Sequence, residues 1–432
     1  MSDSRTAACQ ILDAVLDNGK PLDTILAGDR TLAKLDARDR AQARRIIAMV
    51  LRRLGELDAQ IADCLDRPLA GRHARVRNIL RVGTAELLFL KTPAHAAVDA
   101  AVHQAARYRR GAFKGLVNAV LRRIGRKPES RESTHAPGEI NTPDWMLTRW
   151  REIYGADTAR EITDAHLVEP TLDLTLSKRA DPAEWAAKLD AEILPGGTLR
   201  RKTGGRVAEL PGFEDGIWWV QDVAASLPAK LLRNDAEARV IDLCAAPGGK
   251  TLQLTDRGAA VTAVDISTGR GAALQENLAR TGLKAKIVCA DASQWHPDQL
   301  VDAVLLDAPC TATGTIRRHP DILWRRHAGD ITSATRLQDR LLNAAISMVA
   351  PGGTIVYTVC SLEPEEGPAR IEALLASGAP VTLDPISPDE WPELDGLDPA
   401  AITPAGTLRT LPCHWSERGG MDGFFATRLI RN

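Results

Sequence analysis

Apolar residues recur at three- and four-residue intervals through the first part of the chain. One such set is Ala7, Ile11, Leu12, Val15 and Leu16, and another is Ile46, Ile47, Val50, Leu51 and Leu54. This spacing is typical of amphipathic helices that each bury one face. Because the pattern continues to residue 126, we expect residues 1–126 to form an all-α bundle of ordinary domain size.

The helical periodicity is lost over residues 127–142, where Pro, Glu, Ser and Thr are frequent, so we expect a linker there. Residues 143–222 then mix short elements. Helices are predicted to begin at Pro143 and near Asp181, and strands are predicted at 172–176, around Leu199 and at 207–210. This mixture predicts a small α+β domain.

From residue 223 onward, short apolar runs alternate with helical segments. The predicted strands cover residues 240–243, 261–264, 286–289, 301–306, 353–359 and 423–430. This alternation is typical of a doubly wound, mostly parallel α/β sheet, so residues 223–432 should form a Rossmann-like domain. Such sheets bind ligands at the carboxyl ends of their strands, and the residues that follow each strand are therefore the candidates for chemistry.

The composition agrees with several soluble domains. A chain of 432 residues is too long for one ordinary core, and 44% hydrophobic with 26% charged residues is typical of globular proteins. No signal peptide or membrane-spanning run is visible. The seven cysteines are scattered without a C-x-x-C pair, which favours a reducing cytoplasm and provides no framework for a metal site.

The charge is distributed unevenly. Residues 1–130 carry 24 Lys and Arg against 14 Asp and Glu, whereas residues 131–432 carry 31 against 42. A basic first domain suggests an anionic partner such as RNA, and Arg122 and Arg123 could contact its phosphates. The alternative is a solvated, Arg-rich helical surface with no ligand.

The first strand of the α/β domain is followed by a glycine-rich turn, Asp-Leu-Cys-Ala-Ala-Pro-Gly-Gly-Lys-Thr at 242–251. A phosphate-binding P-loop would need glycine where Cys244 stands, and G-x-G-x-x-G is absent. The next two strands end in Asp265, placed to accept from ribose hydroxyls, and Asp291, placed to accept from an adenine amino group. Together these features suggest a nucleoside cofactor such as S-adenosylmethionine; the alternative is that the acids are helix caps.

Two cysteines follow the next strands. Asp307-Ala-Pro-Cys310 ends one of them, and Cys360 ends another. A buried cysteine at a strand end is normally an inert small hydrophobe. A zinc site would need further ligands such as Cys244 and His319, and no C-x-x-C spacing supports such a site. The third possibility is that one thiolate adds to a substrate as a nucleophile.

At these residues the sequence resembles the Sun/Fmu branch of the RNA cytosine-C5 methyltransferases, in the NOL1/NOP2/Sun superfamily. The resemblance is carried by 242–251, by Leu-Asp-Ala-Pro-Cys-Thr-Ala-Thr-Gly-Thr-Ile-Arg-Arg-His-Pro-Asp at 306–321 and by Cys-Ser-x-x-Pro-Glu-Glu at 360–366. Residues 117–123, Val-Asn-Ala-Val-Leu-Arg-Arg, look like the NusB-type RNA-binding domain of the bacterial small-subunit rRNA methyltransferase B group. The tail at 408–425 also fits, so the resemblance spans the chain.

The resemblance implies a class I methyltransferase fold and roles for individual residues. Cys360 would be the nucleophile, Cys310 would help to release the methylated base, Asp307 would contact the cytosine ring, and Lys250 would face the reaction centre. The implied S-adenosylmethionine site comprises Cys244, Ala245, Ala246, Pro247, Gly248, Gly249, Lys250, Asp265, Asp291 and Asp307. Arg317 and Arg318, together with Arg122 and Arg123, would hold RNA phosphates, with ion pairs from Arg317 and Arg318 to Asp321 as the alternative.

The implied chemistry suits a thiol. Carbon C5 of cytosine is a poor nucleophile, and thiolate addition at C6 makes it enamine-like, while a donor such as Asp307 at N3 would stabilise the adduct. The base must be unstacked to enter the site. DNA cytosine methyltransferases use the cysteine after Pro on the fourth strand together with a Glu-Asn-Val motif, which is absent here, so Cys360 is the better nucleophile. The chain also has Val359 where the family usually has Thr.

The sequence therefore predicts S-adenosylmethionine-dependent methylation of cytosine C5 in ribosomal RNA, by a cytoplasmic monomer without a metal or a membrane partner. Two alternatives belong to other classes. One is a catalytically silent RNA-binding or ribosome assembly factor, and the other is a methyltransferase that acts on another RNA or on DNA.

Overall fold

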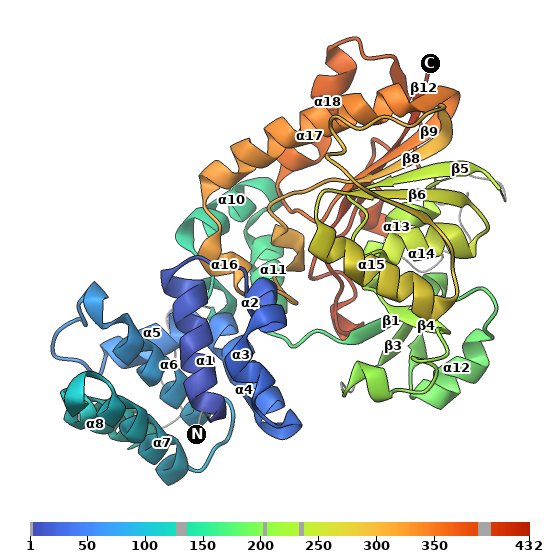
Figure 1. The fold of residues 1–432 in the computed structure, drawn as a ribbon. Helices are drawn as coiled ribbons and strands as arrows, with labels where there is room; N and C mark the ends of the chain where they lie inside the picture. The colour runs from blue at the N-terminus through green and yellow to red at the C-terminus, as the bar shows by residue number, and fades with distance from the viewer. Residues whose placement is uncertain (1–2, 127–135, 202–204, 233–236, 388–398) are drawn as a thin grey trace. The chain divides into compact units, whose positions relative to one another are not determined.

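The computed structural model describes residues 3–126, 136–201, 205–232, 237–387 and 399–432, which divide into two compact units (Figure 1). The first unit comprises residues 1–168 and 316–326. The second comprises residues 169–315 and 327–432. A segment that follows the Cys310 motif in sequence therefore belongs to the unit that begins at the N-terminus.

The first unit is helical, as predicted. Its helices are α1 (Ser4–Leu12), α2 (Leu22–Gly28), α3 (Arg30–Ala33), α4 (Ala37–Arg52), α5 (Leu54–Ala62), α6 (Ala74–Leu88), α7 (Ala94–Arg107), α8 (Lys114–Arg126), α9 (Pro137–Ile140), α10 (Asp144–Tyr154), α11 (Ala156–His166) and α16 (Ile322–Arg325). The apolar positions named from the sequence, including Ile11, Leu12, Ile46 and Val50, form one buried cluster. Gly83 lets α6 approach α8 closely, since a Cβ there would lie 2.6 Å from Leu121 Cδ1.

Two boundaries differ from the prediction. Most of the expected linker lies outside the described residues, but its last part forms α9. Helices α10 and α11 belong to the first unit, although they were expected in the small α+β domain. Contacts of His166 in α11 explain this, because Arg52 Nε at the end of α4 donates to the His166 carbonyl at 3.0 Å, and Trp150 of α10 packs against the His166 ring.

The remaining small domain is an antiparallel sheet in the order β2-β3-β1-β4, with α12 (Pro182–Leu189) beside it. The strands are β1 (Leu172–Leu176), β2 (Glu192–Ile193), β3 (Leu199–Arg201) and β4 (Trp218–Val220). The strand expected at 207–210 was wrong: Val207–Glu209 is a 3-10 turn, in which Arg206 pairs with Glu209 at 2.5 Å. A buried ion pair between Asp173 and Arg200, at 2.6 Å, joins β1 to β3.

The large sheet of the second unit has the order β10-β12-β9-β8-β5-β6-β7. Its strands are β5 (Arg239–Leu243), β6 (Ala260–Asp265), β7 (Lys286–Cys289), β8 (Val301–Asp307), β9 (Val349–Val359), β10 (Val381–Leu383) and β12 (Phe425–Arg431), and β11 (Leu408–Arg409) pairs with β12. Strands β5 to β9 are mutually parallel, whereas β12 runs antiparallel to β9. The six strands predicted for this domain are confirmed, and the short β10 and β11 were not foreseen.

Helices cover both faces of this sheet (Figure 1). Helices α17 (Ala328–Met348) and α18 (Pro368–Ala376) pack on one face, and α13 (Val223–Lys230), α14 (Gly249–Asp256) and α15 (Thr268–Thr281) pack on the other. The chain order reverses between β5 and β8, which lie next to each other. At such a switch point the loops after the strands diverge and leave room for a ligand.

Candidate active site

The turn after β5 is shaped by backbone geometry. Gly248 has φ +107°, and a Cβ at this residue would lie 2.3 Å from Leu274 Cδ1, so only glycine fits. The turn leads directly into the N-terminus of α14. Beneath it, Asp242 is fully buried and accepts a hydrogen bond from Thr251 Oγ1 at 2.5 Å. Burial raises the pKa of Asp242 to about 7.

Asp265 joins this turn to the end of β6. Its Oδ2 accepts from Ala246 N at 3.1 Å, and its Oδ1 accepts from Ser267 N at 2.8 Å and from an exposed guanidinium, that of Arg270, at 3.0 Å. Asp291, after β7, is accessible, and its Oδ1 accepts from the Ser293 amide and hydroxyl. These hydrogen bonds lower the pKa of Asp291. Both acids bond local backbone, but neither is a helix N-cap, because Ser267 caps α15 and turns follow Asp291.

The chemistry of these groups fits S-adenosylmethionine. Strands β5, β6 and β7 are adjacent and parallel, so the glycine turn, Asp265 and Asp291 lie along one edge of the sheet. Two carboxylates at consecutive strand ends can accept from ribose hydroxyls and an adenine amino group. The closely approaching backbone of the turn can contact the amino-acid part of the cofactor.

The two cysteines named from the sequence lie together. Cys310 Sγ is 3.4 Å from Cys360 Sγ. Their strands β8 and β9 are neighbours, with Asp307 opposite Thr358, and Ala308 N donates to Thr358 O at 2.9 Å. The hydrogen bond with Cys360, and secondarily burial, raise the pKa of Cys310 well above its usual value. Cys310 therefore keeps its proton at neutral pH and can donate it to a Cys360 thiolate.

Lys250 and Asp307 form an ion pair beside the thiols. Lys250 Nζ lies 2.7 Å from Asp307 Oδ2 and 5.2 Å from the centre of the Phe424 ring. Burial lowers the pKa of Lys250, but the charge of Asp307 and its hydrogen bond more than offset this, so the pKa is raised. Lys250 is therefore a fixed cation. The Asp307 carboxylate accepts from Lys250, whereas the predicted contact with cytosine N3 needs it to donate.

Phe424 is a site residue to which the sequence prediction gave no role. It lies just before β12, whose antiparallel pairing with β9 places Phe425 opposite Val359. The Gly-Gly-Met-Asp-Gly-Phe-Phe run at 419–425 was the available signal. Val359 itself is buried in the apolar core under α17, so an apolar side chain suits the position where the family usually has Thr.

The predicted RNA-binding arginines are in different environments. Arg122 and Arg123 are exposed on α8, as a phosphate contact requires. Arg317 is only 1% exposed, and its carbonyl accepts from Arg52 Nη2 at 2.7 Å. The buried guanidinium of Arg317 does not fit the predicted phosphate contact. Arg318 is half-exposed and lines a hollow of the first unit together with residues of α2 and α4. Asp321 pairs with Arg325 at 2.7 Å.

His319, considered as a metal ligand, lies 3.0 Å from Asp23 in the first unit, where the two side chains pair. Cys244 is partly buried, and desolvation raises the pKa of its thiol far above the usual range. A metal ligand must be deprotonated, so neither position favours a zinc site with the two active-site thiols.

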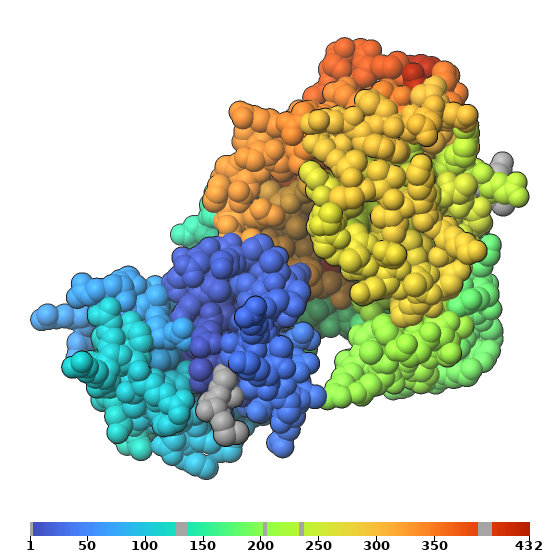
Figure 2. All heavy atoms as spheres, in the orientation of Figure 1, coloured from blue at the N-terminus to red at the C-terminus, as the bar shows by residue number. Residues whose placement is uncertain are grey.

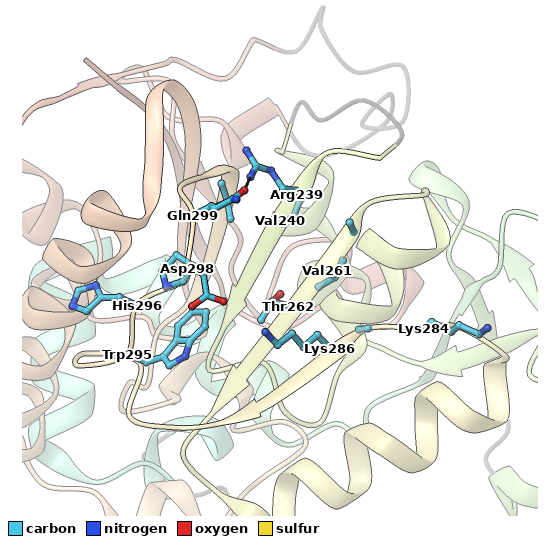
Figure 3. A pocket seen from close by; sticks show the side chains of 14 residues that line it. Arg239, Val240, Val261, Thr262, Lys284, Lys286, Trp295, His296, Asp298 and Gln299 are labelled. Carbon is cyan, nitrogen blue, oxygen red and sulfur yellow. Dashed lines mark hydrogen bonds between the residues drawn. The ribbon is translucent and has the colours of Figure 1, made fainter.

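The surface of the second unit is hollowed between its yellow and orange segments, which include α15 and α17 respectively (Figure 2). Another hollow, of about 700 Å³, is lined by Arg239, Thr262, Lys286 and Trp295 (Figure 3). Because it lies where β5 to β8 begin, it is at the opposite edge of the sheet from the thiols. The hollow in Figure 3 is therefore separate from the candidate active site.

Comparison with known proteins agrees with this geometry. Residues 229–430 match the family model described as 16S rRNA methyltransferase RsmB/F, and residues 2–126 match the NusB family. The ribosomal RNA small subunit methyltransferase B of Klebsiella pneumoniae is 35% identical over 443 residues, covering 99% of this chain and 98% of the relative. The chain belongs to the RsmB/F methyltransferase family. It is an S-adenosylmethionine-dependent methyltransferase with a NusB-like domain at its N-terminus.

Solved structures show that the RsmB/F fold is shared widely. The crystal structure of PH0851 superposes with a TM-score of 0.78 at 24% identity, covering 99% of both chains. NSun6 from Pyrococcus horikoshii, solved with SFG, superposes with a TM-score of 0.56 at 20% identity, covering 67% of this chain and 98% of NSun6.

Across the described residues, none of the helices has both the length and the apolar character needed to cross a bilayer.

Proposed function

We propose that this protein methylates carbon C5 of a cytosine in small-subunit ribosomal RNA through a covalent adduct with Cys360. The observation that carries the proposal is the 3.4 Å separation of the Cys310 and Cys360 sulfurs at the ends of adjacent parallel strands, beside the Lys250–Asp307 pair. Inert structural cysteines have no need of a partner thiol and a buried cation. The full-length similarity to ribosomal RNA small subunit methyltransferase B supports the substrate class.

The roles of the residues follow from their chemistry. The Cys360 thiolate forms a bond to C6, which places the displaced electron pair on C5 and N3. Lys250, held as a cation by Asp307, stabilises negative charge near the thiols. Bound S-adenosylmethionine supplies the methyl group as an electrophile. Afterwards the C5 proton leaves to a base, and the electron pair of that C–H bond expels the Cys360 thiolate.

Cys310 is suited to the release step. Its Sγ is close enough to Cys360 Sγ to share a hydrogen bond, and its raised pKa keeps Cys310 protonated until the Cys360 sulfur leaves. We assign Cys310 to pass its proton to the departing Cys360 thiolate, and the Cys310 thiolate that remains is the base that accepts the C5 proton. RNA enters with its target base unstacked, and exposed cations of the NusB-like domain, Arg122 and Arg123, contact its phosphates.

The substrate assignment is tested by bisulfite sequencing of ribosomal RNA from cells with and without the gene. We expect one or a few cytosines of small-subunit rRNA to lose protection when the gene is absent and to regain it with the wild-type gene. The Cys360→Ala gene should not restore protection. An identical bisulfite pattern in both strains would contradict the proposed substrate.

A further inference from the structure

Glu366 is a buried carboxylate between the two cysteine loops. It ends the short 3-10 helix η7 (Pro364–Glu366), and none of its surface is exposed. Its Oε1 accepts from Thr311 N at 2.8 Å and from Gln338 Nε2 at 3.2 Å. Its Oε2 accepts from Thr311 Oγ1 at 2.5 Å and from Ser361 Oγ. One side chain therefore receives four hydrogen bonds.

Two of the three residues that donate to the Glu366 carboxylate are direct sequence neighbours of the thiols. Thr311 follows Cys310, and Ser361 follows Cys360. The hydroxyls of Thr311 and Ser361 are also 3.1 Å apart. Because the two loops follow different strands, a single carboxylate spans the gap between them. Gln338 of α17 adds a third attachment, since its Nε2 also donates to Pro309 O at 3.0 Å.

A merely structural role does not explain a carboxylate at this position. All four donors to Glu366 are neutral groups, and burial raises its pKa although the hydrogen bonds from Ser361 and Thr311 oppose this. An apolar side chain of similar volume would fill the same space without burying charge. The carboxylate attaches both loops at once, because its Oε2 accepts from the hydroxyls of Thr311 and Ser361, while its Oε1 holds the Thr311 amide and Gln338.

We propose that Glu366 is a positioning residue that sets the separation of Cys310 and Cys360 and so lets both thiols act on one base. What the thiols do rests on the proposed function, but the geometric part does not. Other bonds between the loops, Gly314 N to Cys360 O at 3.0 Å and Leu362 N to Thr313 Oγ1 at 2.9 Å, hold the backbone. Among the side chains next to the thiols, those of Thr311 and Ser361 both donate to Glu366 Oε2.

Two substitutions of Glu366 distinguish the effect of its side-chain length from the effect of its charge. Glu366→Asp keeps the charge but is one methylene too short to reach both loops. Glu366→Gln keeps the length; its amide oxygen can accept from Thr311 N, and its NH2 can donate to the hydroxyls of Thr311 and Ser361. If positioning is the role, the Gln variant resembles the wild type more than the Asp variant does. Glu372→Gln, an exposed glutamate of α18, is the matched control.

The thiol separation can be measured without any methylation. Diamide oxidises two nearby thiols to a disulfide, and peptide mass spectrometry follows the Cys310–Cys360 bond. We expect the wild type, Glu372→Gln and Glu366→Gln to form this bond at rates within about threefold of one another. Glu366→Asp should be slower by about tenfold, the cost of misplacing buried hydrogen-bonded groups. Ser361→Ala, which removes one donor, should also be slower.

Methylation kinetics then test whether the thiol separation affects catalysis. Glu366→Asp should lower kcat by about tenfold or more with little change in KM for RNA, and Glu366→Gln should recover most of kcat. Equal disulfide rates in the wild type, Glu366→Asp and Ser361→Ala would overturn the positioning role. Slow disulfide formation in Glu366→Asp without any loss of kcat would support the positioning role of Glu366. It would contradict the proposed function of the thiols in methylation.

Discussion

Lys250 and Asp307 are the residues whose chemistry depends most on each other. Their side chains are 2.7 Å apart, and Lys250 is only 8% exposed. Removing the Asp307 charge from this partly buried pair leaves the buried Lys250 cation without compensation. We expect Asp307→Asn to lower the single-turnover methylation rate by about 10²-fold. Asp302→Asn, an exposed carboxylate near the start of the same strand, should stay within about twofold of the wild type. An unimpaired Asp307→Asn enzyme would contradict the assigned role.

Asp242 makes stability depend on pH. Its folded-state pKa of about 7 is above the ordinary 3.8, so the folded protein binds the proton more tightly than the unfolded chain does. The resulting stabilisation is present at low pH and is lost as the pH rises from about 4 to about 7. Asp242→Asn should remove up to about 1.4 kcal/mol per pH unit of this slope in urea unfolding. Parallel slopes for the variant and the wild type would contradict this.

Residue types and spacing predicted much of the site, because a parallel sheet brings its strand ends together. Asp307, Cys310 and Cys360 could be placed on one edge from strand order alone. The sequence could not reveal that Glu366 bonds the neighbours of both cysteines, because this depends on how η7 folds back under the loops. Nor could it show that Arg317 is buried, since an arginine in a polar run is normally exposed.

At the scale of elements, residues 316–326 are the most unexpected segment. They follow the Cys310 loop in sequence but belong to the helical first unit. Trp324 Nε1 donates to Leu51 O at 2.7 Å, and Asp321 Oδ2 accepts from Leu22 N at 3.1 Å. Periodicity predicts local elements but carries no information about which core a short segment joins. The same reason explains why α10 and α11 were expected with the small α+β domain, although they group with the first unit.

This segment should contribute to the stability of the first unit. Asp321 is 2% exposed and bonds both Leu22 N and Arg325 Nε. Asp321→Ala should lower the free energy of unfolding by about 3 kcal/mol, because a buried pair is broken. Hydrogen exchange of the Leu22 amide should become faster at the same time. A change below about 0.5 kcal/mol, the ordinary effect of a surface substitution, would contradict the role of the segment.

At the scale of the whole molecule, the chain combines a basic NusB-like domain with a methyltransferase domain. If Arg122 and Arg123 contact phosphates, replacing both with Gln should weaken RNA binding and reduce the slope of log K against log salt by about 1.4 for single-stranded RNA. Lys188→Gln, an exposed cation of α12, should leave the slope unchanged. Equal slopes for the double variant and the wild type would show that Arg122 and Arg123 do not contact RNA phosphates.

The central claim is that Cys360 attacks the base and Cys310 allows it to leave, and a denaturing gel tests it most directly. Purified Cys310→Ala protein is incubated with S-adenosylmethionine and small-subunit rRNA, and wild type, Cys360→Ala and the double Cys310→Ala/Cys360→Ala variant are run beside it. We predict a protein–RNA adduct that survives denaturation in Cys310→Ala and is absent from both variants without Cys360. An adduct that persists in the double variant, or one that forms in Cys360→Ala, would contradict the assignment.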